Sequence, residues 1–246
     1  MRVRAVRELG ELGDPKAVKP LVGSLDDEDE AVVRESARAL ALLDAADALD
    51  ALEKVKIDKL GRDAMEAVVL AVARIGGVQA MKYVEKVIAQ GSAPGDPRSS
   101  VGIHALGLID SPEARETLLI RLEDPDQALS REAAEALALQ ADALDIKDVL
   151  DILETVPQQS SPNVIRLLGR MGDHGAVKPL TAKLAWGSQE ERRVAATALG
   201  AIGDPLAVVP LVNVLGDSDI VLVERAVTAL GRIGSTSATK ALVALL

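Results

Sequence analysis

The residues of this chain that could do chemistry are mostly arginines, and they recur at fixed distances from a repeated leucine. They occupy positions six, five and two before that leucine and two after it. A guanidinium group binds carboxylate or phosphate in a planar, bidentate way that a lysine ammonium group does not. The pattern is one that could bind anionic groups. The arginines at these positions are Arg4, Arg7, Arg34, Arg38, Arg74, Arg131, Arg166, Arg170, Arg193, Arg225 and Arg232.

Imidazole, thiol and hydroxyl groups give little indication of catalysis or metal binding. The chain has only two histidines, His104 and His174, and no cysteine. The histidines lie far apart in the sequence, so we do not expect them to share a metal ion, and the serine pairs at 99–100 and 160–161 have no histidine base near them. The acidic turn 26–30 lacks the spaced ligands and the glycine of a calcium loop. We predict no catalytic residue, no metal site and no cofactor, and therefore a protein that is not an enzyme.

The leucine that sets these distances belongs to an internal repeat with a period of 31 residues, lengthened slightly around Val72. A second apolar landmark runs in phase with it. Two landmarks per period predict two amphipathic helices per repeat: an inner helix that ends near the first landmark and an outer helix that carries the second. The inner landmarks are Leu9, Leu40, Val72, Leu106, Leu137, Leu168, Leu199 and Leu230, and the outer ones are Leu21, Leu52, Val84, Leu118, Val149, Leu180, Leu211 and Leu242.

The joint between the two helices also follows a rule. Gly13, Gly172, Gly203 and Gly234 fall where an inner helix must end, and glycine accepts the left-handed conformation of a helix C-terminus. The next residue is an aspartate in the first three of these copies, and aspartate is a good N-cap. We therefore predict an all-α chain of about eight helix pairs that forms a single domain over residues 1–246.

Three strings of the sequence resemble HEAT repeats, and more narrowly the short HEAT-like repeats of phycobilisome lyases. They are 17–21 (AVKPL), 176–180 (AVKPL) and 193–200 (RVAATALG). The resemblance implies a right-handed α-solenoid whose inner helices line a concave groove. Deoxyhypusine hydroxylase is a HEAT-like enzyme that binds iron through His-Glu pairs. Here His104 precedes alanine and His174 precedes glycine, which removes the reason to expect that activity.

The arginine positions point away from the landmark leucine on each inner helix, so we expect them on the groove, together with His104. Only six acids share these positions, which leaves a surplus of five positive charges there on a chain of net charge −10. Two interpretations stay open. Arginine–glutamate pairs between neighbouring repeats could simply solvate the groove, or the groove could be a track for an anionic partner. The acids are Glu11, Glu35, Glu66, Glu132, Glu135 and Glu224.

Two further features bear on partners. Trp186, the only tryptophan, could be a binding anchor, or it could cap the edge of the core. The segment 241–246 (ALVALL) forms an outer helix without a following inner helix and carries no polar cap. We expect this end to pack on a second copy, another subunit or further sequence, so self-association is one prediction.

The function predicted from these features is a protein-binding scaffold that holds an acidic or extended partner along the groove. One alternative, which rests on the family resemblance, is a chaperone-like subunit of a bilin lyase or related complex. The other is a module that binds phosphate or a nucleic-acid backbone, which the net charge and the scarcity of aromatic residues disfavour. No apolar run reaches the roughly 20 residues of a membrane span, and no signal peptide is visible. We therefore predict a cytoplasmic location.

Overall fold

The computed structural model describes residues 1–91, 96–234 and 236–243, and over these residues it contains helices and no strand. The predicted all-α class is confirmed. Contacts divide the chain into two compact units, Met1–Glu116 and Thr117–Leu246. The last three residues of the predicted uncapped end, 244–246, lie outside the described residues. The single domain predicted over the whole chain stays a prediction, and each unit is described by itself.

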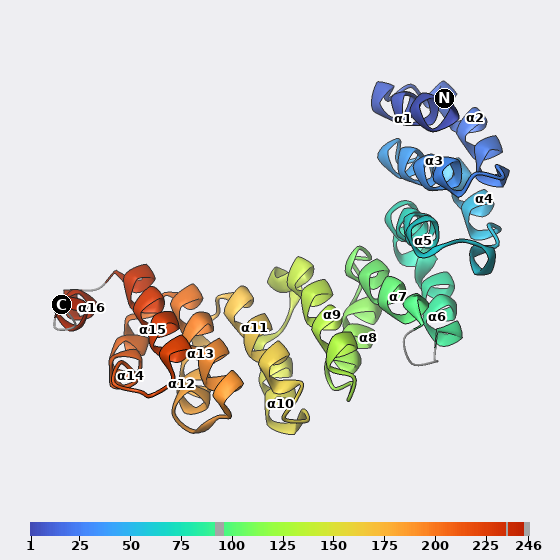
Figure 1. Ribbon diagram of the computed structural model, residues 1–246. Helices are drawn as coiled ribbons and strands as arrows, with labels where there is room; N and C mark the ends of the chain where they lie inside the picture. The colour runs from blue at the N-terminus through green and yellow to red at the C-terminus, as the bar shows by residue number, and fades with distance from the viewer. Residues whose placement is uncertain (92–95, 235, 244–246) are drawn as a thin grey trace. The chain divides into compact units, whose positions relative to one another are not determined.

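Unit 1 is a stack of helix pairs in which consecutive inner helices pack against one another (Figure 1). Its inner helices are α1 (Arg2–Leu12), α3 (Glu30–Leu42), α5 (Arg62–Gly76) and α7 (Pro97–Gly107). Its outer segments begin as short 3-10 turns and continue as α2 (Val18–Gly23), α4 (Leu49–Glu53) and α6 (Met81–Gln90). The helix α8 (Pro112–Leu122) spans the boundary between the units.

Unit 2 repeats this arrangement, again with successive contacts between inner helices. Its inner helices are α9 (Gln127–Leu137), α11 (Ser161–Met171), α13 (Gln189–Ile202) and α15 (Ile220–Ile233). Its outer helices are α10 (Ile146–Thr155), α12 (Val177–Trp186), α14 (Val208–Asn213) and α16 (Thr236–Val243).

The core consists of the two landmark series. Apart from Leu9 at the start and Leu242 near the end, every inner and outer landmark side chain is fully buried. Burying the same face of each helix forces the opposite faces outward, because one side of an α-helix returns every three to four residues. The two-helix repeat predicted from the period is therefore confirmed.

The joints are built as predicted. Gly13, Gly172, Gly203 and Gly234 have φ angles of 69°, 70°, 75° and 64°, which is the left-handed region at a helix C-terminus. The aspartates that follow accept backbone hydrogen bonds two residues on: Asp14 from Lys16, Asp173 from Gly175 and Asp204 from Leu206. Each joint thus ends one helix and caps the next within two residues.

A second glycine, directly after the landmark leucine, has a role that the sequence analysis did not predict. A Cβ atom on Gly200 would lie 2.6 Å from the backbone Cα of Ala229 on the next inner helix. Gly10 faces Ala39 and Gly169 faces Ala198 in the same way, with distances of 2.9 and 2.8 Å to Cα. No side chain fits at these distances, so these glycines let neighbouring inner helices touch backbone to backbone.

Gly200→Ala should therefore destabilise the protein by about 1–3 kcal/mol, because a methyl group there overpacks a rigid helix contact. Gly231 is the matched control, since it has the same place in α15 and nothing lies within 4 Å of its Cβ direction. Gly231→Ala should be neutral or stabilising by up to about 1 kcal/mol through helix propensity. Urea unfolding measures the change in unfolding free energy of both variants. Equal changes would show that the backbone contact at Gly200 does not require glycine.

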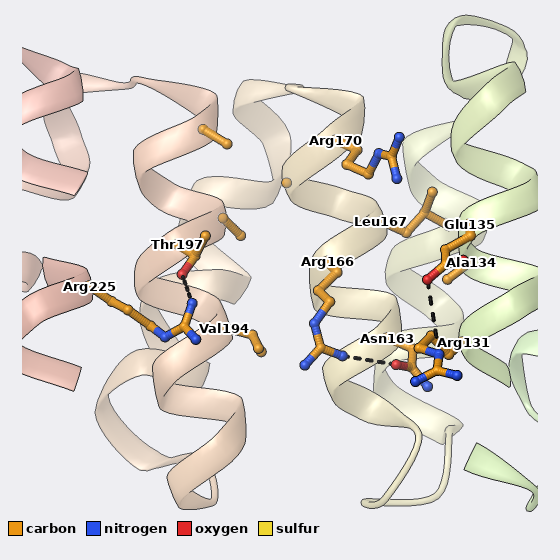
Figure 2. A pocket seen from close by; sticks show the side chains of 13 residues that line it. Arg131, Ala134, Glu135, Asn163, Arg166, Leu167, Arg170, Val194, Thr197 and Arg225 are labelled. Carbon is orange, nitrogen blue, oxygen red and sulfur yellow. Dashed lines mark hydrogen bonds and ion pairs between the residues drawn. The ribbon is translucent and has the colours of Figure 1, made fainter. Parts of the chain in front are cut away.

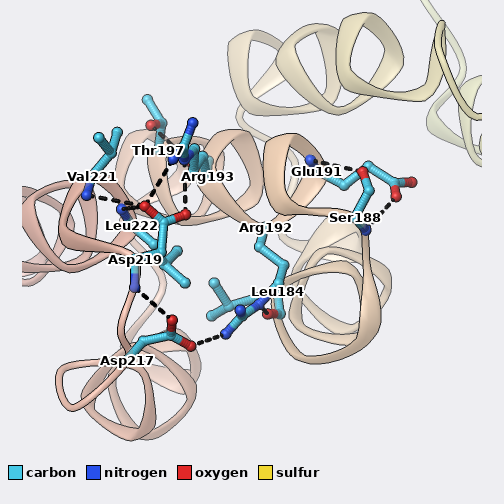
Figure 3. A network of polar contacts seen from close by, with 10 residues as sticks. All are labelled: Leu184, Ser188, Glu191, Arg192, Arg193, Thr197, Asp217, Asp219, Val221 and Leu222. Carbon is cyan, nitrogen blue, oxygen red and sulfur yellow. Dashed lines mark hydrogen bonds and ion pairs between the residues drawn. The ribbon is translucent and has the colours of Figure 1, made fainter.

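A buried carboxylate joins three helices at the start of α13. Glu191 is 3% exposed and forms a capping box with Ser188, which Figure 3 shows. Its carboxylate also accepts hydrogen bonds from Ser161 Oγ of α11 at 2.7 Å and from Lys183 Nζ of α12 at 2.8 Å. Burial alone would raise the pKa of Glu191, but these donors, Lys183 above all, lower it to about 2.

Because the pKa of Glu191 is 4.5 when unperturbed and about 2 in the folded state, its ionised form stabilises folding above pH 4.5. That contribution, about 3 kcal/mol, is lost as the pH falls from 4.5 towards 2. Glu191→Gln should lower stability at pH 7, and its difference from the wild type should shrink over that window. Glu154→Gln, an exposed change on α10, is the control. A difference that is independent of pH would exclude this account.

One described segment, Arg62–Gln90, is long and apolar enough to cross a membrane by length and composition. In the structure it is two helices, because α5 ends at Gly76 and Gly77 takes a φ of 49° before α6 starts at Met81. Of its most apolar window, 56% is buried inside the protein. Its apolar character is accounted for by the core of the repeat.

Candidate functional site

A hollow of about 360 Å³ lies over the inner helices of unit 2, and every residue that lines it belongs to α9, α11, α13 or α15. Its floor is apolar and made largely of small residues, and it is lined by Ala134, Leu167, Val194, Ala198 and Ala201. Its polar lining is dominated by arginines, as Figure 2 shows. The four arginines are Arg131, Arg166, Arg170 and Arg225.

The charge of this hollow is strongly one-sided. The only acid in its lining is Glu135, whose Oε1 lies 4.0 Å from Arg131 Nε on the same helix. Four guanidinium groups and one carboxylate line the hollow, and a second carboxylate, Glu190, contacts Arg166 from outside the lining at 2.7 Å, so positive charge is in excess. Figure 2 shows Arg166 and Arg225 on either side of Val194, so the positive groups border an apolar floor.

Arg166 is held in place by a buried network that the sequence analysis missed. Its Nη1 donates to Asn163 Oδ1 at 2.9 Å, and Asn163 is 1% exposed. The Asn163 amide in turn donates to Ser130 Oγ at 3.1 Å and to the Gln127 carbonyl at 3.3 Å, both on α9. Asn163 lies five residues before the landmark Leu168, at one of the four positions predicted to face away from the core, and its neutral side chain does not belong to the charge pattern.

The other arginines of the hollow are less constrained. Arg225 Nη1 donates to Thr197 Oγ1 at 3.1 Å, a hydrogen bond to a neutral group. Arg170 has no carboxylate partner among the residues that the structure describes. Arg166 also contacts Glu190 Oε1 at 2.7 Å, but both side chains of this pair are nearly half exposed. Most of the guanidinium N–H groups of Arg170 and Arg225 are thus available to a ligand.

Arg193, also predicted for the groove, is paired with a carboxylate of the next repeat. Its Nε and Nη2 bind both oxygens of Asp219 at 2.8 and 2.9 Å (Figure 3). Asp219 is the N-cap of α15, and the hydrogen bonds from Arg193 lower its pKa to about 2. Arg193 therefore ties two repeats together and does not line the hollow.

The remaining predicted arginines form separate groups. Arg232 borders a smaller depression of unit 2 with Arg225 and Thr197. In unit 1, Arg4 contacts Glu8 of its own helix at 3.6 Å, whereas Arg7, Arg34 and Arg38 converge on Glu35. Arg74 borders a second hollow together with Arg38. Some of the predicted arginines are thus paired with carboxylates, as the interpretation of a solvated groove requires. Others have no carboxylate partner among the described residues, as the interpretation of an anion-binding track requires.

Within the described residues, neither histidine belongs to a group of side chains large enough to hold a metal ion. His104 is half-buried on α7. His174 Nδ1 lies 2.6 Å from Asp204 Oδ2, at the joint between repeats. In the described part of the chain no group of three or more histidine, aspartate and glutamate side chains could hold a metal ion.

The repeat seen in the structure also matches a known family of helical repeats. The model of HEAT repeats matches residues 1–73 and 177–246, more than half of the chain. The chain belongs to the HEAT-repeat family. The recognition made from the three repeated strings is therefore confirmed.

Several solved structures are similar to this HEAT-repeat protein. Human deoxyhypusine hydroxylase in complex with glycerol is 21% identical, with 94% of this chain and 89% of that chain covered and a TM-score of 0.41. The CpcE–CpcF complex of phycocyanin lyase from Nostoc sp. PCC7120 is 18% identical, with 92% of each chain covered and a TM-score of 0.45. No curated protein sequence matches the chain.

Trp186 is the last residue of α12, and its side chain is 89% exposed. The interpretation that it caps the edge of the core is wrong, because an indole in that role would be covered by neighbouring side chains. A role as a binding anchor stays a prediction.

Trp186→Ala should change the free energy of unfolding of the HEAT-repeat protein by less than about 0.5 kcal/mol, since the side chain buries little surface. Leu184→Ala, two residues earlier and 1% exposed, is the matched core change and should cost about 2–5 kcal/mol. Chemical denaturation compares the two. A loss from Trp186→Ala as large as that from Leu184→Ala would show that the indole is packed.

Proposed function

We propose that this HEAT-repeat protein is a non-catalytic binding module that holds an acidic, extended segment of another protein in the hollow of unit 2. The observation that carries the proposal is the lining of that hollow. Arg131, Arg166, Arg170 and Arg225 surround an apolar floor with one acid among them, and all of them project from inner helices.

Each part of the hollow matches a property of such a segment. Guanidinium groups bind carboxylates in a bidentate manner, and these charge-assisted hydrogen bonds are stronger than neutral ones. The floor offers burial to aliphatic side chains at about 25 cal/mol per Å² of apolar surface. Packed helices lie about 8–10 Å apart, which an extended chain covers in roughly three residues. A segment that crosses α9 to α15 would therefore need acidic side chains near the arginines and apolar side chains over the floor.

The absence of aromatic residues from the lining of this hollow disfavours the stacking of nucleic-acid bases. Net charge −10 also opposes long-range attraction of a polyanion. Backbone-only binding of nucleic acid is kept as an outcome of the test below. The chaperone-like subunit of a bilin lyase stays a hypothesis that rests on family resemblance. A cytoplasmic location also stays a prediction, compatible with a chain that lacks cysteine.

The test uses the full chain and a fluorescent peptide of alternating glutamate and leucine, with binding followed by fluorescence anisotropy. Replacing Arg166 and Arg170 together by glutamate should weaken binding at least tenfold, because two charge-assisted contacts become repulsive. Lys147→Glu with Lys178→Glu is the matched control. It makes the same change in net charge on the outer helices α10 and α12, at exposed lysines outside the hollow. Arg193 is left intact because it holds the cap of α15.

Equal loss of affinity in both double variants would show a general charge effect and would exclude the hollow as the site. Unfolding curves of the variants confirm that the fold is kept. A labelled DNA duplex of similar charge is the second ligand. Tighter binding of the duplex than of the peptide, with a steep decline in affinity as salt rises, would replace the peptide proposal by binding of a phosphate backbone.

A further inference from the structure

One buried carboxylate in unit 1 holds three arginines. Glu35 of α3 is 5% exposed and accepts hydrogen bonds from Arg7 Nε of α1, and from Arg34 Nε and Arg38 Nη1 of its own helix, each at 3.2 Å. The pKa of Glu35 would rise through burial, but the hydrogen bonds from Arg7 and Arg34 lower it below its ordinary value. The carboxylate is therefore ionised and carries one negative charge.

This cluster has more positive charge than its carboxylate needs. One cation neutralises one carboxylate, so three guanidinium groups around Glu35 leave a surplus of two positive charges. Holding like charges side by side opposes folding. Neutralising Glu35 therefore does not account for all three arginines. The two additional positive charges have no explanation in the stability of the fold.

The surplus charge faces outward. The side chains of Arg7 and Arg38 are 55% and 58% exposed, whereas that of Glu35 is 6% exposed. Each guanidinium group has five N–H donors, and Arg7 and Arg38 each use one hydrogen bond on Glu35. The remaining donors of these two arginines, one from α1 and one from α3, are free to bind a second anion above the buried carboxylate.

A hollow whose lining is apolar apart from Arg38, Glu66 and Arg74 lies beside this cluster. It measures about 440 Å³, and Arg38 is part of its lining, so the two features share a residue. Its apolar surface includes Leu42 of α3, Leu70 of α5 and Leu108, the residue after α7, and Leu42 and Leu108 are 61% and 45% exposed. Exposed leucines bordering a hollow are available for contact with an apolar side chain of a partner.

We infer that unit 1 carries a second binding site, which takes a phosphorylated residue of a protein segment on Arg7 and Arg38 and a neighbouring large apolar residue in the hollow. A phosphate monoester carries close to two negative charges at neutral pH and three acceptor oxygens, which match a surplus of two charges and two bidentate donors. A single carboxylate would match only half of that charge. The site is independent of the function proposed for unit 2.

The experiment measures binding of the full chain to three fluorescent peptides. Each has one variable residue, two spacer residues and a leucine, and the variable residue is phosphoserine, glutamate or serine. The phosphoserine peptide should bind at least tenfold more tightly than either of the others. Arg7→Gln with Arg38→Gln should remove most of this preference while the fold is kept, since Arg34 still neutralises Glu35, and an unfolding curve checks that the variant is folded. Lys16→Gln with Lys19→Gln, exposed lysines of the first outer segment, is the matched control and should leave the preference intact.

Two further measurements separate the alternatives. Leu42→Ser with Leu108→Ser should weaken the phosphopeptide at least threefold without changing the stabilisation of the fold by inorganic phosphate, measured against sodium chloride of equal ionic strength. Changing Arg166 and Arg170 should leave phosphopeptide binding intact, which distinguishes this site from the hollow of unit 2. Equal affinity for the three peptides, or an unchanged preference after the loss of Arg7 and Arg38, would overturn the inference. Inorganic phosphate that binds as tightly as the phosphopeptide would also overturn it, in favour of a site for the free anion.

Discussion

The backbone contact between a glycine on one inner helix and an alanine on the next is the constraint on which the rest of the structure depends. Gly10 with Ala39, Gly169 with Ala198 and Gly200 with Ala229 all occupy the same places in their repeats. Contact at this distance fixes both the spacing and the register of neighbouring inner helices, because no side chain lies between the backbones. Two of the three pairs lie wholly within the residues that the HEAT-repeat model matches.

The same close contact makes the hollow of unit 2. Gly169 and Ala198 belong to its lining, and small residues at these places leave space above the backbone that larger side chains would fill. The long arginine side chains of the flanking positions then stand around that space. The residues at this helix contact therefore also form part of an apolar floor with charged edges.

Carboxylates have two different roles on these helices: some stabilise a helix N-terminus, and one holds several arginines together. Asp219 and Glu191 are bound to cations and to helix N-termini, and their lowered pKa values show that they stabilise the fold as anions. Glu35 instead holds three arginines at once and leaves positive charge in excess. Whether an arginine is structural or available to a ligand thus depends on the ratio of cations to acids around it.

The repeat, its two helices, the buried landmarks and the joints could all be predicted from the sequence, because each follows from a local rule. The repeat period, the buried helical face and the helix caps all depend on sequence within about 31 residues. A leucine such as Leu168 or Leu199 is buried independently of which side chains lie on the opposite face of its helix. Which arginines are free could not be predicted in this way. Arg193 and Arg170 both fulfil the groove pattern, yet Arg193 is bound to Asp219, 26 residues later, and Arg170 borders the hollow. Such partners lie on neighbouring helices, at distances that depend on how closely the backbones pack, so only the tertiary structure decided which arginines are bound to carboxylates of the fold and which line the hollow.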